Sequence, residues 1–182
     1  DSLASIGFEA FKNCTSLSEI NFPLSWASVP SYRDYYDGPD YQGQIFTGCT
    51  NLKKITVPAG VTKIPDCAFS YCSYLEEIVI PSTVETIGSY AFYECISLKN
   101  IELPNTLKTI NSHAFWNCTG LSDVILPDSV TTIDDDAFFY CKKLREVSIG
   151  VGVKKIGDNA FDYCDSLSIV YYAGTFEQWQ AI

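Results

Sequence analysis

One stretch decides the fold: residues 72–92 read CSYLEEIVIPSTVETIGSYAF, and variants of this string recur along most of the 182-residue chain. Its final Ala-Phe pair occurs at 23-residue intervals, with the phenylalanines at Phe69, Phe92, Phe115, Phe138 and Phe161. Phe46 continues the series backwards by one period, and Phe11 lies 35 residues earlier, which is one period plus 12 residues. Seven copies of one unit are therefore present, and such a fixed period indicates a repeat protein.

Each unit repeats the same apolar positions. A cysteine follows the phenylalanine by three residues, and a leucine follows the cysteine by three, as in Cys72 and Leu75. Two apolar residues then alternate, as in Ile78 and Ile80, and Pro81 follows. This period of two predicts a short strand that buries every second side chain, and the proline ends the strand because it cannot donate a ladder hydrogen bond. We therefore expect one strand per coil.

The unit closes with a second apolar pair three residues apart, such as Val84 and Ile87. The next position holds residues that tolerate positive φ in most units: Gly7, Gly88, Asn111, Asp134 and Gly157. This composition predicts a sharp turn at that position. Pro65 stands there in one unit, so we expect that coil to bend differently.

Stacking is required, because no 23-residue unit can bury its apolar face alone. The prediction is a single solenoid domain over residues 1–182, with an insertion at 24–44 and a C-terminal capping segment at 174–182. Thr175 and Gln178 have the spacing of a capping box, and Phe176, Trp179 and Ile182 share one helical face. We expect a short helix that shields the open end of the last coil.

The pattern Cys-x-x-Leu-x-x-Ile-x-Ile-Pro-x-x-Val-x-x-Ile-Gly-x-x-Ala-Phe resembles the repeat of the BspA-like leucine-rich repeat surface proteins of bacteria and some protozoa. The likeness covers nearly the whole chain. It implies a curved, right-handed solenoid of about seven coils with a parallel β-sheet on the concave face. It also implies a secreted or cell-surface protein, with signal peptide and anchor outside these residues, that adheres to host proteins or other microbes.

Composition excludes several classes. The chain carries 12 Lys and Arg against 22 Asp and Glu, a formal charge of −10, which argues against binding to nucleic acid. With 47% hydrophobic and 19% charged residues, it is not a disordered chain. No apolar stretch approaches the roughly 20 residues that cross a bilayer.

The cysteines favour a structural role. Seven of the eight occupy one repeat position, where stacked coils would hold their side chains parallel and about 4.8 Å apart. A disulfide prefers a Cβ separation of about 3.8 Å, so we expect a ladder of buried free thiols. Cys67 is the exception, and we expect it to face solvent. With no C-x-x-C and only one histidine, we expect no metal site.

No motif indicates catalysis or a cofactor. His113 and Cys118 lie five residues apart, but Cys118 is a repeat cysteine. P-loop, nucleophile-elbow and dinucleotide motifs are absent. The run Asp134-Asp135-Asp136 lacks calcium-loop spacing and indicates a solvated turn. We predict that the protein is not an enzyme and holds no cofactor.

Candidate binding residues fall into three groups. Val79, Glu102, Ile125 and Tyr171 lie on the exposed side of the expected strands, where a concave sheet binds partners, although strand propensity also favours such residues. The insertion either carries recognition or folds back over an edge, and its aromatic residues are Trp26, Tyr32, Tyr35, Tyr36 and Tyr41. Trp116 belongs to an aromatic set that either stacks outside, suited to sugars, or extends the core.

The favoured function is a non-enzymatic surface module that binds a host or microbial protein through the concave sheet and the insertion. A carbohydrate-binding module that uses exposed aromatic residues is the alternative. A structural spacer that displays a neighbouring domain is a third reading.

Overall fold

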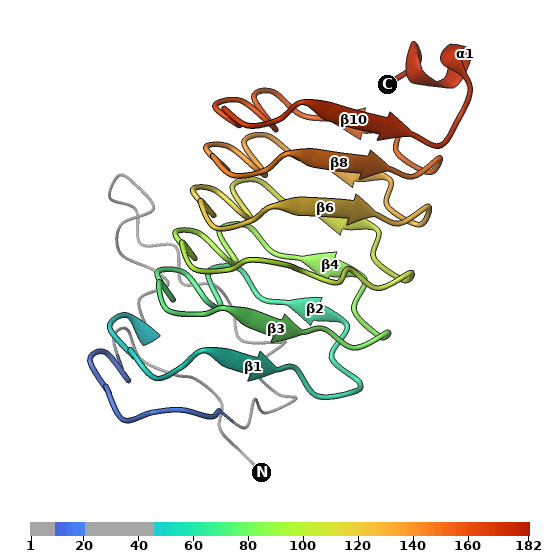
Figure 1. The fold of residues 1–182 in the computed structure, drawn as a ribbon. Coiled ribbons are helices and arrows are strands. Elements are labelled where there is room, and N and C mark those ends of the chain that lie inside the picture. The colour runs from blue at the N-terminus through green and yellow to red at the C-terminus, as the bar shows by residue number, and fades with distance from the viewer. Residues whose placement is uncertain (1–9, 21–45) are drawn as a thin grey trace, which may run out of the picture.

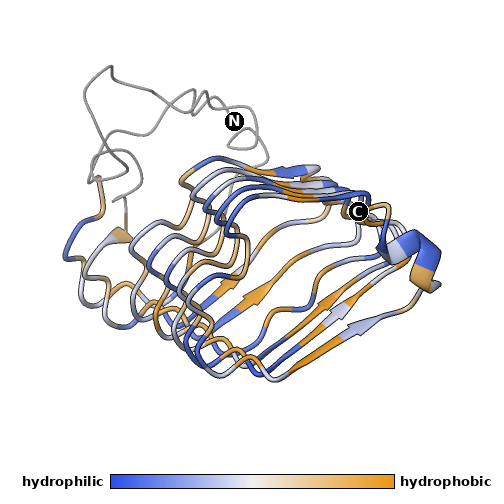
Figure 2. Ribbon diagram, turned by 90° about the horizontal axis from the view of Figure 1, so that it is seen from above, coloured by the Kyte–Doolittle hydropathy of each residue, from blue (hydrophilic) through white to orange (hydrophobic). Residues whose placement is uncertain are grey.

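The computed structural model describes residues 10–20 and 46–182. Successive coils stack along one axis, from residues near the N-terminus at the bottom of Figure 1 to the C-terminal residues at the top. Viewed from above, apolar residues recur at the same places around each coil (Figure 2). The predicted class, a parallel β-solenoid with a 23-residue step, is confirmed.

The longer strands lie on one side of the stack, which we call the strand face (Figure 1). They are β1 (Lys54–Thr56), β3 (Glu77–Val79), β6 (Asp123–Leu126), β8 (Glu146–Ile149) and β10 (Ile169–Tyr172). β1 pairs with β3, and β6, β8 and β10 form a second parallel sheet, always between residues 23 apart. Between β3 and β6, the Ser122 N–H donates to the Lys99 carbonyl at 3.2 Å, which keeps the intervening coil in register.

A second ladder, which the sequence did not predict, runs along another side. It is a five-stranded parallel sheet of two-residue strands: β2 (Lys63–Ile64), β4 (Thr86–Ile87), β5 (Thr109–Ile110), β7 (Thr132–Ile133) and β9 (Lys155–Ile156). The apolar pair of this segment has a spacing of three, which does not alternate as a strand does. Several coils therefore have two strands, one on each of these sides.

The number of turns counted within the described residues is lower than the predicted number of coils. The five strands of the second ladder mark about five turns within the described residues, whereas the sequence suggested about seven coils. In the first unit the second-ladder segment falls in residues 21–45, outside the described part. In the last unit, helix α1 (Phe176–Trp179) follows β10 in place of a second strand.

Two left-handed residues turn the chain in each typical coil. One set has φ between 55° and 59° and comprises Cys67, Tyr90, His113, Asp136 and Asn159. The other has φ between 53° and 62° and comprises Asn13, Tyr71, Glu94, Asn117, Tyr140 and Tyr163. Each such backbone N–H can then point along the stack: that of Tyr90 donates to the Ser112 carbonyl at 3.1 Å, and that of Glu94 to the Trp116 carbonyl at 2.9 Å. These hydrogen bonds offset a conformational cost of about 1 to 2 kcal/mol per residue.

The turn prediction was therefore displaced by two residues. Gly88 does not have positive φ, and the left-handed residue of its coil is Tyr90. Gly88 is instead required by close approach, since a Cβ there would lie 2.5 Å from the backbone nitrogen of Asp66. The expectation for Pro65 was wrong, because Cys67 in that coil adopts φ 57°, close to the 58° of Tyr90.

Phenylalanine rings form the axis of the core. Phe115 lies between Phe92 and Phe138, with ring centroids 5.0 Å away on each side and planes within 7° of parallel. The column continues to Phe69 and Phe161, at 5.5 and 5.2 Å from their neighbours. Such pairs contribute about 0.5 to 1.5 kcal/mol beyond burial of area. The repeated phenylalanine thus couples each coil to the next.

The cysteine column is also buried, and its thiols join the coils. All eight cysteines are free, and those of the column from Cys49 to Cys164 are buried. The Cys95 Sγ donates to the Phe69 carbonyl of the preceding coil at 3.2 Å, and Cys118 and Cys141 do the same with Phe92 and Phe115. The expected ladder is wrong at Cys14, which is exposed beside the exposed Phe11. Cys67 is half-buried and does not simply face solvent.

The predicted C-terminal helix is present, but it covers little of the open end of the last coil. The Gln178 N–H donates to the Thr175 hydroxyl at 3.3 Å, and the Thr175 N–H to the Gln178 side chain at 2.8 Å, which completes the predicted capping box. Phe176 is nevertheless 70% exposed, and α1 lies at one corner of the last coil (Figures 1 and 2). A four-residue helix is too short to span the coil, so the end is not shielded as expected.

Candidate interaction surface

The strand face exposes one column of side chains of mixed character. Strand alternation turns Ile78, Val124 and Val147 into the core and turns their neighbours outward. Val79, Ile125 and Tyr171 are 41%, 71% and 56% exposed, respectively. Exposed apolar side chains on a solvent-facing strand are candidates for contact with a partner.

These side chains share one register position. Thr56 pairs with Val79, Ile125 with Ser148, and Ser148 with Tyr171. Glu102 occupies the same repeat position in the coil between β3 and β6, and it is exposed. The structure therefore gathers four predicted site residues into one column, and we call its three apolar or aromatic members, Val79, Ile125 and Tyr171, the apolar column.

Charged side chains beside the apolar column pair with one another across coils. Lys54 Nζ lies 2.5 Å from Glu77 Oε1, and Lys99 Nζ lies 2.8 Å from Glu76 Oε2. The Lys99 hydrogen bond lowers the pKa of the exposed Glu76 carboxyl. Exposed pairs contribute at most about 1 kcal/mol each to stability. Their main effect here is to neutralise charge next to the apolar column.

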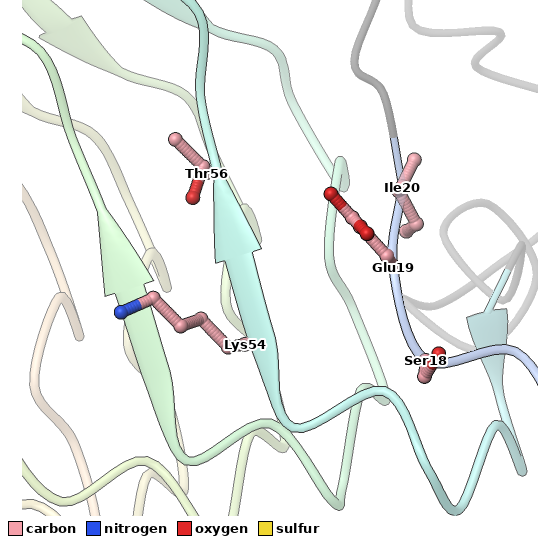
Figure 3. Close-up of a pocket in the computed structure, with 5 residues that line it drawn as sticks. All are labelled: Ser18, Glu19, Ile20, Lys54 and Thr56. Atoms are coloured by element: carbon pink, nitrogen blue, oxygen red, sulfur yellow. The ribbon is translucent and has the colours of Figure 1, made fainter.

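A cavity opens at the N-terminal end of the strand face (Figure 3). It lies between residues 18–20 and β1, has a volume of about 320 Å³ and is lined by Ser18, Glu19, Ile20, Lys54 and Thr56. The Glu19 side chain points toward β1, whereas that of Lys54 points away from residues 18–20 (Figure 3). We call this cavity the slot.

The slot exists because the first two coils separate on the strand face. On the turn side they are joined, since the Asn13 N–H donates to the Thr47 carbonyl at 2.8 Å. At the next junction the Glu76 N–H donates to the Lys53 carbonyl at 2.8 Å, but the Lys53 N–H itself donates to Asn51 at 3.0 Å rather than to the preceding coil. This break was not predicted from the sequence, although the 12 extra residues between Phe11 and Phe46 are its signal.

The aromatic set around Trp116 packs ring on ring. The Trp116 ring lies between those of Tyr93 and Phe139. Its centroid is 4.7 Å from that of Tyr93 and 5.7 Å from that of Phe139, and the interplanar angles are 11° and 7°. Because neighbouring rings cover each other's faces, Trp116 is only half-exposed and Tyr93 is buried. Tyr163 is an exposed ring in the last coil. This arrangement favours the packing interpretation, since sugars stack on free ring faces.

Among the other predicted features, the insertion residues Trp26, Tyr32, Tyr35, Tyr36 and Tyr41 lie outside the described residues. Within residues 10–20 and 46–182, no group of three or more His, Cys, Asp or Glu side chains is placed to hold a metal ion. No helix of that part is long and apolar enough to cross a membrane.

The His113 and Cys118 side chains are each engaged in packing. His113 stacks on Tyr90 at 4.6 Å, and its Nε2 lies 3.5 Å from the Asp136 carboxylate. Burial lowers the pKa of His113. Burial raises the pKa of Cys118 well above its usual value, and its thiol donates to the Phe92 carbonyl. Such a cysteine stays protonated and is a poor nucleophile.

Comparison with known proteins places this architecture in a family. The family described as "BspA type Leucine rich repeat region" matches six copies over residues 1–33 and 41–173. The chain therefore belongs to the BspA-type leucine-rich repeat family. No curated protein sequence matches it significantly.

Several solved structures share the fold. A leucine-rich cell surface protein from Faecalibacterium prausnitzii is 35% identical with a TM-score of 0.69, over 71% of this chain and 34% of that protein. The Treponema pallidum leucine-rich repeat protein is 36% identical with a TM-score of 0.67, over 70% of this chain and 60% of that protein. The pneumococcal vaccine antigen PcpA is 27% identical with a TM-score of 0.61, over 71% of this chain and 33% of PcpA. This chain thus spans about a third to three fifths of the length of these proteins.

Proposed function

We propose that this protein is a non-enzymatic interaction module, secreted or displayed at a microbial cell surface, that binds a protein partner through its strand face. The observation that carries the proposal is the apolar column, in which Val79 projects from one parallel sheet and Ile125 and Tyr171 project from a second. The cell-surface description of the Faecalibacterium relative supports the location.

The strand face has the features of a protein-binding surface. Its backbone is held by parallel ladder hydrogen bonds, so little conformational entropy is lost when a partner docks. Tyrosine, which the strand face exposes at Tyr171, is enriched among the residues that contribute most to binding at protein interfaces. Adhesion to host or microbial surface proteins is the role we assign to this face.

The proposal is tested with a panel of purified extracellular-matrix and cell-surface proteins immobilised for surface plasmon resonance. We expect at least one to bind, with affinity at least tenfold weaker for Ile125→Ser. The matched control is Ile96→Ser, which alters an exposed isoleucine outside the strands. Absence of binding across the panel, or equal losses in the two variants, would contradict the proposal.

Carbohydrate binding is the second candidate, and the half-exposed Trp116 and exposed Tyr163 are the rings that would serve it. A glycan array separates the two functions. Oligosaccharide binding that is lost in Trp116→Ala would favour the carbohydrate module, whereas a silent array with intact protein binding favours the strand face.

A further inference from the structure

The slot differs from the apolar column because backbone groups of its walls have no hydrogen-bond partner among the residues that the structure describes. On either side of β1, the Lys53 carbonyl accepts from the Glu77 N–H at 3.1 Å, and the Val57 N–H donates to the Val79 carbonyl at 3.0 Å. Residues 53, 55 and 57 therefore direct their backbone groups toward β3. Alternation along a strand turns those of Lys54 and Thr56 to the opposite edge, toward the slot. No described residue forms a backbone hydrogen bond with that edge.

The facing wall has the same property. At later junctions the carbonyl of the corresponding residue accepts a hydrogen bond from the next coil, as the Ser122 carbonyl does from the Arg145 N–H at 2.8 Å. Ser18 holds this position in the first coil, and among the described residues its carbonyl accepts no such bond. The edge of β1 and residues 18–20, which form no strand, thus face each other across the cavity and form no backbone hydrogen bond with each other. A free strand edge is a template for an added strand.

The charge of the slot is set by Glu19. Its carboxylate points toward β1, and it forms no ion pair with any described residue (Figure 3). Lys54, the cation of the opposite wall, is engaged with Glu77 on the far side of β1. An occupant with a basic side chain opposite Glu19 would therefore be attracted, and an acidic one would be repelled.

We propose that the slot binds an extended segment of a partner protein, which pairs with the slot-facing edge of β1 as an added strand and places a lysine or arginine beside Glu19. The inference rests on the proposed function and deepens it, because it specifies the backbone conformation and charge of the recognised segment. β1 has three residues, so the paired core of the segment is about three residues long.

The chain's own repeat supplies a probe and a matched control. A fluorescent, end-blocked peptide of residues 51–58, NLKKITVP, has the strand pattern with two lysines. The peptide of residues 74–81, YLEEIVIP, has the same pattern with two glutamates. By fluorescence anisotropy with the full 182-residue chain, we expect the lysine peptide to bind at least tenfold more tightly. Glu19→Lys should reverse that order.

Backbone pairing is tested separately from charge. Thr56→Pro removes an N–H that faces the slot, so it should abolish binding of the lysine peptide and leave the melting temperature nearly unchanged. Val79→Pro is the control at the same register position, because its N–H faces β1, and it should lower the melting temperature. Methylation of the peptide's own isoleucine amide should weaken binding to the unaltered protein, which requires no protein variant to fold.

Different experimental outcomes would contradict the slot proposal and the strand-face function. The slot proposal is overturned if neither peptide binds, if both bind equally, or if Glu19→Lys and amide methylation change nothing. Partner binding that depends on Ile125, with no peptide binding, would leave the strand-face function standing and remove the slot. Peptide binding that survives Ile125→Ser, with no protein bound by the panel, would support the slot and remove the strand-face function.

Discussion

The middle of the solenoid and its C-terminal end contain the same side chains in different surroundings. Val147 in β8 is buried, whereas Val170, its register partner in β10, is 50% exposed. Phe138 is buried between two rings, and Phe161 at the end of the column is only half-buried. Burial in this protein is therefore supplied by the neighbouring coil, and stability should depend on the interfaces between coils.

The largest expected effect breaks the phenylalanine column at its centre. Phe115→Ala removes a buried ring that contacts one ring on each side, and we expect the free energy of unfolding to fall by about 3 to 5 kcal/mol. Phe161→Ala removes a ring with one stacked neighbour in the column and should cost clearly less. Urea denaturation monitored by circular dichroism measures both losses. Equal losses would show that the end coil is as well packed as the middle.

Thiol ionisation gives the next effect, through pH. Burial raises the pKa of Cys95 and of Cys118 well above the ordinary 9.0. Above pH 9.0 the unfolded chain releases these protons and the folded chain keeps them. Stability should therefore fall as pH rises beyond that value, by about 1.4 kcal/mol per pH unit for each buried thiol. Denaturation curves at pH 8 to 10 test this, and a Cys118→Ala variant should show a shallower slope.

Alkylation of the native protein compares the reactivity of the cysteine thiols in the middle coils with that of the thiols near the ends. The neighbouring Cys141 thiol lowers the pKa of Cys164 in the last coil, whereas burial raises the pKa of Cys118. We expect iodoacetamide to modify Cys14 and Cys67 first, Cys164 next and Cys118 only on unfolding. Peptide mass spectrometry over time gives the order. Early modification of Cys118 would mean that the middle coils open readily.

Relief of left-handed strain should give a smaller, stabilising effect. Glu94 has φ 60°, which costs a side chain with a Cβ about 1 kcal/mol or more, so Glu94→Gly should raise the free energy of unfolding by about 1 kcal/mol. Asn159→Gly near the C-terminal end should yield only a few tenths, because asparagine tolerates this conformation. Thermal unfolding of both variants measures the difference, and a destabilised Glu94→Gly would contradict it.

The smallest effect concerns the helix at the end. Trp179 is 41% exposed, and its ring lies 5.4 Å from that of Tyr172. Trp179→Ala should therefore cost about 1 kcal/mol, roughly the value of one aromatic pair. Gln180→Ala is the neighbouring control and should have no measurable effect. A loss of several kcal/mol in Trp179→Ala, with oligomers in light scattering, would show that the helix does protect the end.

The 23-residue period of the sequence predicted the structural features that recur from coil to coil. The Phe115 and Cys118 columns and the outward positions of Val79 and Ile125 follow from a fixed 23-residue step combined with strand alternation. The second ladder was not predicted because Val84 and Ile87 are three residues apart, which does not match the two-residue period of a strand. Tyr90 was missed as a turn residue because its left-handed conformation is imposed by the hydrogen bond to the next coil, which propensity does not reveal.

The parts of the candidate site that broke the repeat were harder to predict. The slot depends on where residues 18–20 lie relative to β1, and a change in spacing between Phe11 and Phe46 does not specify that position. The exposed Phe176 shows the same limit at the other end, where a correct capping box did not imply coverage.

The fixed 23-residue step also bears on how the chain folds. Bonds between coils from β1 onward join residues about 20 to 26 positions apart, as in Ser70 to Tyr90 and Cys118 to Phe92, so the loop to be closed does not lengthen as coils are added. Each completed coil becomes the template for the next, and the folding rate should depend weakly on the number of coils. At the first junction Cys49 bonds to Phe11 across 38 positions, and the longer loop adds about 0.4 kcal/mol of closure entropy. Folding is therefore expected to begin in the regular coils and to reach residues 10–20 last.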